Sequence, residues 1–213
     1  MATTPRRGLP TVFVTRLAGL ASGDNQCVWA TWFAARFRYD KYEEGEFDSA
    51  AWAADHDALV LARAAEFELG GAKVRLEKEN WIRVTGETVI LTGKPDIVAV
   101  EGGLHTIADG KTGAVRKKDW WQALLYTYMV LKAWNPNLRV MAEVVYKTQR
   151  IQVSPHEFTP ELKKHAFGIL RRMGDATEPA RTPSINECRF CDIAQCPDRL
   201  KDTPDTTPTT LDF

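Results

Sequence analysis

The sequence lacks any apolar run near the roughly 18 residues that a membrane-spanning helix needs, so we expect no bilayer crossing. It also lacks a charge surplus, because 28 basic side chains face 28 acidic ones, and this balance argues against a nonspecific polycation. A hydrophobic content of 44% excludes disorder of the whole chain. Arg6-Arg7 faintly imitates an export signal, but Arg16 interrupts the apolar stretch that follows. We therefore expect a cytoplasmic protein.

Internal repeats are also lacking, and the length suits a single domain. We expect this domain to cover residues 1–201. Residues 202–213 are rich in Thr, Pro and Asp, a composition typical of a flexible tail.

Apolar periodicity and turn residues divide the chain into helices and short strands. One predicted helix follows Asp48 and stops at Gly70-Gly71, and another has Thr159 as its N-cap and ends at Gly174. The other predicted helices cover residues 24–37 and 118–134. The predicted strands cover residues 74–84, 88–91, 96–100, 104–109, 138–147 and 150–153. The fold class is therefore α/β, with a mixed central β-sheet flanked by helices.

Cysteine is scarce, and three of the four residues lie near the end of the chain, at Cys188, Cys191 and Cys196. The fourth, Cys27, lies in the first predicted helix. Nothing indicates an oxidising compartment, and a Cys-x2-Cys pair is too close for an ordinary structural disulfide. Thiols at this spacing suit a zinc ion or an iron–sulfur cluster, with a fourth ligand from elsewhere. Cys27 takes that role only if segments 20–40 and 184–200 meet at a cysteine-ligated cluster.

Three charged side chains fall at the ends of two neighbouring predicted strands. Asp96 begins one strand, and Asp109 and Lys111 end the next, two residues apart and therefore on one face. A hairpin across residues 101–103 would place Asp96 beside that pair. Carboxylate oxygens hold Mg²⁺ or Mn²⁺, with the Gly110 carbonyl as a further ligand, and the lysine would stabilise charge during phosphodiester hydrolysis.

The following helix carries residues that would face this site. Gln122 and Tyr126 are four residues apart and so share a helix face. Just before them lies a basic and aromatic segment that would contact DNA and stack on unpaired bases. This segment contains Arg116, Lys117, Lys118, Trp120 and Trp121.

Together these motifs resemble the PD-(D/E)XK nuclease superfamily in its RecB-like iron–sulfur branch. The motifs are Gly93-x-Pro95-Asp96, Asp109-x-Lys111, Gln122-x3-Tyr126 and the four cysteines, in the family's order. The branch includes CRISPR-associated RecB-like exonucleases and AddB-type helicase–nucleases. The middle acidic residue is Asp109, as in the helicase–nucleases, whereas CRISPR-associated members more often carry Glu.

The resemblance implies a restriction-endonuclease-like core and assigns roles within it. Asp96 and Asp109 would be metal ligands, His56 a further ligand and Lys111 the catalytic lysine. Gln122 and Tyr126 would support the site and touch DNA. The four cysteines would hold a [4Fe–4S] cluster, which we interpret as a structural clasp between the chain's two ends.

The resulting expectation is an Mg²⁺- or Mn²⁺-dependent DNA exonuclease that acts on DNA ends or single strands. Two alternatives stay open: a catalytically inactive nuclease fold that binds DNA or serves as a scaffold, and a structure- or sequence-specific endonuclease. A helicase or a CRISPR integrase would be a fitting partner. Residues 209–213 are loosely similar to peptides that dock on a bacterial sliding clamp.

Overall fold

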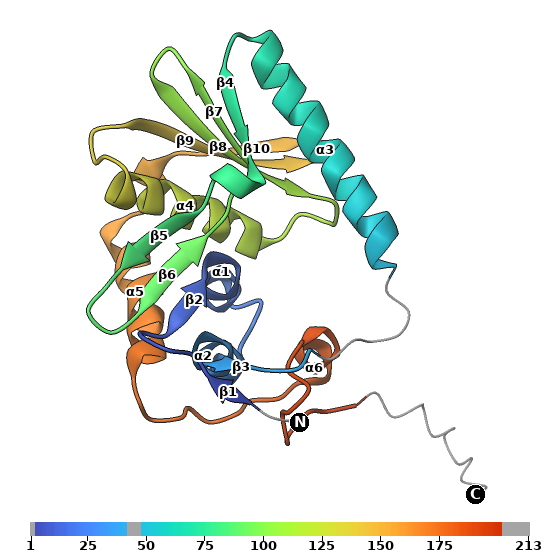
Figure 1. Cartoon of the computed structure of the whole chain (residues 1–213), viewed down its shortest axis with the longest axis vertical. Coiled ribbons are helices and arrows are strands. Elements are labelled where there is room, and N and C mark those ends of the chain that lie inside the picture. Colours follow the sequence, from blue (N-terminus) through green and yellow to red (C-terminus); the bar gives the residue numbers. More distant parts are fainter. Residues whose placement is uncertain (1–2, 42–47, 202–213) are drawn as a thin grey trace, which may run out of the picture.

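The computed structural model describes residues 3–41 and 48–201. In these residues the strands form three β-sheets, with helices packed around them (Figure 1). The strands are β1 (Thr4–Pro5), β2 (Thr11–Phe13), β3 (Phe37–Arg38), β4 (Lys73–Leu76), β5 (Ile82–Thr85), β6 (Ile90–Gly93), β7 (Ile97–Glu101), β8 (Leu104–Lys111), β9 (Arg139–Tyr146) and β10 (Arg150–Val153). The helices are α1 (Val14–Ser22), α2 (Val28–Arg36), α3 (Ser49–Leu69), α4 (Lys117–Ala133), α5 (Pro160–Gly174) and α6 (Ile185–Phe190). Two short 3-10 helices are η1 (Glu77–Glu79) and η2 (Pro155–Glu157).

The central sheet is mixed, as the sequence predicts. Its five strands run in the order β10-β9-β8-β7-β4. The neighbours β8 and β9 are parallel and are joined through α4, whereas the other pairs are antiparallel. The β7–β8 hairpin pairs Ile97 with Ala108, so that Asp96 and Asp109 come next to each other at one end of the sheet.

Helices cover both faces of this sheet, and the strand sequences show why. In β7, Ile97 and Ala99 pack with Val60 of α3, while Val98 between them packs in the main core with Leu124 of α4. Apolar residues on both sides of a strand are typical of a sheet buried on both faces. Figure 1 shows α3 along one side of the sheet and α4 on the other.

The remaining elements form a second layer beneath α4. A three-stranded sheet, β2-β6-β5, pairs the N-terminal strand β2 in parallel with β6. Helix α1 packs on α4 and α5. The first and last described segments of the chain therefore share one core with the central sheet.

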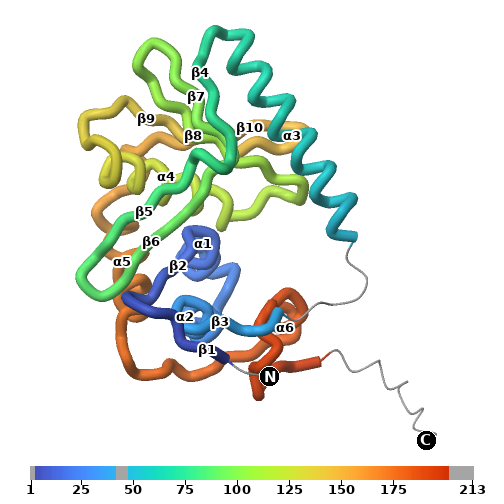
Figure 2. The backbone as a smooth tube through the Cα atoms, in the orientation of Figure 1, coloured from blue at the N-terminus to red at the C-terminus, as the bar shows by residue number. Residues whose placement is uncertain are grey.

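The two ends of the described chain lie side by side (Figure 2). Lys41 forms a β-bridge with Ile193, and the backbone N–H groups of Gln26 and Cys27 donate to Glu187 of α6 at 2.6 and 3.1 Å. The two segments 20–40 and 184–200 therefore meet, whereas their junction through a cysteine-ligated cluster stays a prediction. The predicted tail, residues 202–213, lies outside the described residues.

Several predicted boundaries differ from the structure. The helix predicted over residues 24–37 is α2, and Cys27 is its N-cap residue instead of an interior one. The strand predicted over residues 74–84 is broken by η1. The break has a tertiary cause, because buried Asn80 donates side-chain hydrogen bonds to the carbonyls of Arg75, Pro95 and Asp96. Cys188 lies in helix α6, which follows the last helix that the sequence predicts.

The predicted N-termini of two helices are confirmed. Asp48 accepts a hydrogen bond from the Ala51 N–H at 2.9 Å and caps α3, and Thr159 caps α5. Within residues 3–41 and 48–201, the search for bilayer-crossing helices finds none that is both long and apolar enough.

Candidate active site

Asp96, Asp109 and Lys111 converge at one end of the central sheet. Lys111 forms an ion pair with Asp109 Oδ2, which accepts no hydrogen bond of regular geometry. Asp96 lies across the hairpin, and its Oδ2 accepts a hydrogen bond from the Gly110 N–H at 2.8 Å. All three side chains line one cleft of about 620 Å³. The structure therefore brings the two predicted carboxylates and the predicted lysine together.

Helix α3 brings His56 to the same place. His56 Nε2 lies 3.3 Å from Asp96 Oδ2. A Cβ added to Gly110 would lie 3.1 Å from Val60 and 3.6 Å from both His56 Nε2 and Asp96 Oδ2. Glycine at position 110 thus lets α3 approach the strand closely enough for its histidine to reach the carboxylate.

Helix α4 orients the second carboxylate. Gln122 donates from Nε2 to Asp109 Oδ1 at 2.9 Å and to the Tyr126 hydroxyl at 3.3 Å. Both α4 side chains are buried. The predicted pair therefore faces the site, and Gln122 fixes one oxygen of Asp109 while the other faces Lys111.

The electrostatics follow from burial and from the crowding of charge. Burial raises the pKa of the Asp109 carboxyl to about 6, although Lys111 partly opposes this shift. Burial alone would lower the pKa of the Lys111 ammonium, but the nearby carboxylates outweigh it and the pKa is raised. The hydrogen bond with Asp96 raises the pKa of His56. Without a cation, the site therefore favours protonated forms of these groups.

The donor set fits a divalent cation. Two buried carboxylates, an imidazole and a backbone carbonyl are ligand types that Mg²⁺ and Mn²⁺ accept. Asp109 Oδ2 is buried and, among the described residues, has the ion pair with Lys111 but no hydrogen bond of regular geometry, so a cation has an oxygen to bind. In the described part of the chain, the group whose ligand atoms all lie within 4.8 Å of one another is a neighbouring one, His56, Asp57 and Glu77, so His56, Asp96 and Asp109 are spaced more widely.

The sequence analysis did not identify Asp119 and Tyr146. Asp119 is buried in the first turn of α4, lines the cleft and accepts a hydrogen bond from the Tyr146 hydroxyl at 2.9 Å. Asp119, Gln122 and Tyr126 fall at i, i+3 and i+7, so helix periodicity alone would have placed Asp119 on the site face. Tyr146 pairs in register with Lys111 on the parallel strand β9, which no local pattern reveals.

Glu77, Lys94 and Trp52 are further cleft residues that the sequence analysis did not identify. Glu77 lies in η1 and forms an ion pair with Lys94, with 2.8 Å between Glu77 Oε2 and Lys94 Nζ. Lys94 stands inside the Gly93-x-Pro95-Asp96 motif, which gave the only local signal for it.

The proposed DNA-contacting segment divides into exposed and buried residues. Arg116 and Lys117 are exposed, and Arg116 and Lys118 line the cleft. Trp120 is half-buried and donates to Glu157 at 3.1 Å. The prediction that Trp121 stacks on DNA bases is corrected, because this ring is only 2% exposed and packs edge-on against Phe158 in the core.

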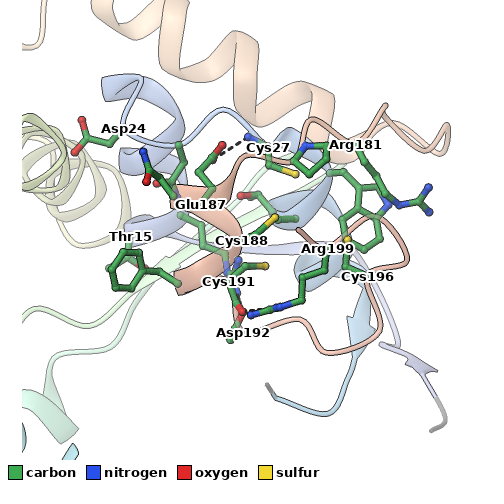
Figure 3. A pocket seen from close by; sticks show the side chains of 18 of the residues that line it. Thr15, Asp24, Cys27, Arg181, Glu187, Cys188, Cys191, Asp192, Cys196 and Arg199 are labelled. Atoms are coloured by element: carbon green, nitrogen blue, oxygen red, sulfur yellow. Dashed lines mark hydrogen bonds and ion pairs between the residues drawn. The ribbon is translucent and has the colours of Figure 1, made fainter. Parts of the chain in front are cut away.

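All four cysteines are free thiols that line a second cavity, of about 640 Å³. Figure 3 shows Cys27, Cys188, Cys191 and Cys196 around this cavity, with Glu187 bonded to the Cys27 backbone. Burial raises the pKa values of Cys191 and Cys196. A set of four thiols fits either an iron–sulfur cluster or zinc in its chemistry. Among the described residues, no three of these sulfurs lie within 4.8 Å of one another, so a tight zinc-like arrangement is not preformed there.

The two cavities adjoin. Thr15, Arg116 and Lys118 line both the carboxylate cleft and the cysteine cavity. These three residues therefore form a common wall, which we refer to by that name below.

The fold and the site together define a class of protein. A mixed sheet covered by helices on both faces, with two carboxylates and a lysine at one strand end, is the arrangement typical of metal-dependent nucleases. A family model described as the PD-(D/E)XK nuclease superfamily matches residues 19–197. The chain belongs to the PD-(D/E)XK nuclease superfamily, and the carboxylate cleft lies within the matched range.

Comparisons with solved structures and with curated protein sequences add little to the family assignment. One solved structure, reported as "Crystal structure of SSO0001", has a TM-score of 0.47 and 14% sequence identity, over 92% of this chain and 90% of that one. The comparison with curated protein sequences gave no match.

Proposed function

We propose that this protein is an Mg²⁺- or Mn²⁺-dependent deoxyribonuclease that hydrolyses phosphodiester bonds at DNA ends or in single strands. The convergence of Asp96, Asp109 and Lys111 in one cleft is the observation that carries the proposal. Membership of the nuclease superfamily supports it.

Asp96, Asp109, His56 and the Gly110 carbonyl would hold the cation. A bound divalent cation would supply Lewis acidity to the phosphate and lower the pKa of an attacking water. The Gly110 N–H bond to Asp96 and the Gln122 bond to Asp109 hold both carboxylates in fixed orientations before substrate arrives.

The surrounding carboxylates raise the pKa of Lys111 and so favour its protonated form. An ammonium in this position would donate to the phosphate oxygens as negative charge develops on them. Arg116 and Lys118 at the edge of the cleft would hold neighbouring backbone phosphates.

The test is cleavage of end-labelled single-stranded, duplex and circular DNA with Mg²⁺ or Mn²⁺. The matched control is Asp109→Asn, which keeps the shape of the side chain and removes its charge. We expect wild-type protein to shorten single strands or ends, and the variant to lose at least about 100-fold in rate, as loss of a main stabilising group does.

The same substrates separate the alternatives. Cleavage of circular DNA would favour an endonuclease. Binding without cleavage of any substrate would favour an inactive nuclease fold that serves as a scaffold, and would contradict the proposal.

We further propose that the chain belongs to the RecB-like branch and that Cys27, Cys188, Cys191 and Cys196 hold a structural [4Fe–4S] cluster. Their common cavity at the junction of the two chain ends supports this. Metal-linked closure of so long a loop would remove much of the unfolded chain's entropy.

A helicase, a CRISPR integrase or a sliding clamp as partner stays a prediction from the sequence. The segment expected to bind a clamp, residues 209–213, lies outside the described residues.

A further inference from the structure

Asp119 is a further buried carboxylate in the cleft that contains Asp109 and Lys111. It is 4% exposed, and its Oδ2 accepts a hydrogen bond from the Tyr146 hydroxyl at 2.9 Å. Tyr146 in turn pairs in register with Lys111 across the parallel strands β8 and β9. Residues that pair across two strands lie on the same face of the sheet. The tyrosine therefore holds the carboxylate of Asp119 on the face that carries the lysine.

The position of Asp119 in the first turn of α4 does not by itself explain its burial. An acid there interacts favourably with the helix dipole, but it does so from an exposed position as well. Glu161 has a place in the first turn of α5, yet it is exposed and does not line the cleft. Burial of a carboxylate costs free energy unless an opposite charge compensates it. Among the described residues, Asp119 has the hydrogen bond from an uncharged hydroxyl and no ion pair.

Lys111 is the cation whose electrostatic environment depends on Asp119. Burial would lower the pKa of the Lys111 ammonium, but Asp109, Asp119 and Asp96, in that order, raise it. Asp119 therefore acts on the ammonium more strongly than Asp96 does. In this structure, however, the ion pair of Lys111 is with Asp109 Oδ2.

That ion pair competes with the binding of a divalent cation. Asp109 Oδ2 is the buried oxygen that a cation would use, and the same oxygen faces the ammonium. Like charges repel, so Lys111 has to leave this oxygen when a cation binds there. Asp96 would also be a ligand of the cation. Of the three carboxylates that act on Lys111, Asp119 is therefore the one that stays available to it.

We propose that Asp119 is a positioning residue, which receives the Lys111 ammonium when a divalent cation occupies Asp109 and so keeps that ammonium in the cleft beside the scissile phosphate. The Tyr146 hydroxyl holds the Asp119 carboxylate in the orientation that this requires. The inference rests on the proposed function and adds a positioning residue to it.

The experiment is a double-variant cycle between Asp119 and Lys111. Calorimetry without DNA measures the Mn²⁺ affinity of wild-type protein, Asp119→Asn, Lys111→Met and the double variant. Asparagine keeps the shape of the side chain and an oxygen for the Tyr146 hydroxyl, but it removes the charge. Glu161→Gln is the matched control, because it removes a first-turn acid outside the cleft. Cleavage of a labelled single strand by Asp119→Asn at saturating Mn²⁺ gives kcat and KM separately.

We expect Asp119→Asn to weaken Mn²⁺ binding about 10-fold where Lys111 is present, and less than about twofold where it is methionine. A coupling of this size is usual between interacting residues. At saturating Mn²⁺, kcat should fall about 10-fold while KM stays within about twofold, because the ammonium acts as charge develops on the phosphate. Glu161→Gln should change neither the affinity nor the kinetics.

An equal loss of Mn²⁺ affinity with and without Lys111 would show that Asp119 acts on the cation itself, and would overturn the inference. The absence of any loss in either background would overturn it as well. In both cases wild-type cleavage would persist and the proposed function would stand. Wild-type protein that binds no Mn²⁺ and cuts no strand would instead contradict the proposed function, and the inference with it.

Melting temperatures check that each variant folds. If Asp119→Asn does not fold, Tyr146→Phe takes its place in the cycle, because it removes the hydroxyl and leaves the carboxylate. We expect a smaller loss of Mn²⁺ affinity for Tyr146→Phe, again confined to protein that contains Lys111. A loss that does not depend on Lys111 would overturn the inference.

Discussion

Tyr126 lies directly against Gly93: a Cβ added to this glycine would come within 2.8 Å of Tyr126 Cε1 and 2.8 Å of Val14 Cγ1. Gly93→Ala should therefore force the tyrosine or the valine to move within a packed core. We expect a loss of about 1–3 kcal/mol in the free energy of unfolding, the usual cost of overpacking. Urea unfolding would measure it.

Gly168→Ala is the matched control for that change. Nothing lies within 4 Å of a Cβ at position 168, which is inside helix α5. Alanine should therefore be neutral or raise stability by about 0.5–1 kcal/mol. Equal losses for both variants would show that the contact between Gly93 and Tyr126 does not restrict the core.

A second prediction concerns the ion pair between α3 and β9. Arg63 donates from Nε and Nη2 to the two oxygens of buried Glu143, at 2.7 and 2.8 Å. Arg63→Met would leave a buried carboxylate unpaired, and we expect it to cost about 3–5 kcal/mol. Chemical denaturation would measure this cost.

The double variant, Arg63→Met with Glu143→Met, should recover much of that loss, because no unpaired charge stays buried. If the double variant is no more stable than Arg63→Met alone, the loss comes from packing and not from the charge.

Cation binding should depend on pH through Asp109 and His56. Their pKa values are raised, Asp109 by burial to about 6 and His56 by its bond with Asp96. Both protons must leave before a cation binds, so the affinity for Mn²⁺ should be weak below pH 6 and rise as the pH passes upward through these values. Calorimetric titration between pH 5 and pH 8 would show this rise.

The variant His56→Gln separates the proton released by His56 from the proton released by Asp109. Wild-type protein should release about two protons per Mn²⁺ near pH 5, where both groups are protonated, and this variant about one, because glutamine does not titrate. Affinity that is constant over the whole pH range would contradict the assignment of Asp109 as a ligand.

The cysteine cavity gives a fourth prediction. If the proposed iron–sulfur cluster is bound, Cys27→Ser should remove the brown colour that it would give and lower the melting temperature, because the cluster would lose the ligand that joins the two chain ends. Absorbance, iron content and thermal unfolding would be measured together. Wild-type protein that is stable, colourless and zinc-bound would refute iron.

The local signals in the sequence predicted most of the elements that build the site. Asp48 and Thr159 cap their helices as their residue types indicate, and the strand pair that carries Asp96 and Asp109 follows from the glycine turn between them. The antiparallel register of that hairpin places Asp96 beside Asp109, and period-two alternation puts Lys111 on the same face as Asp109.

The differences arise where distant residues decide local structure. The strand predicted from residue 74 is broken because Asn80 donates to the carbonyls of Pro95 and Asp96, in the connection between β6 and β7. Trp121 is buried in the core, where it packs edge-on against Phe158, a residue far along the chain. Adjacent tryptophans give no local sign of which one faces the core, and the pairing of Lys111 with Tyr146 needs the parallel register of β8 and β9.

The common wall of Thr15, Arg116 and Lys118 has a consequence for how this protein can change over time. A substitution there changes the lining of both the cysteine cavity and the carboxylate cleft. At these three positions neither cavity can change without the other, so variation should accumulate more slowly there than at Val115, the exposed neighbour that lines neither.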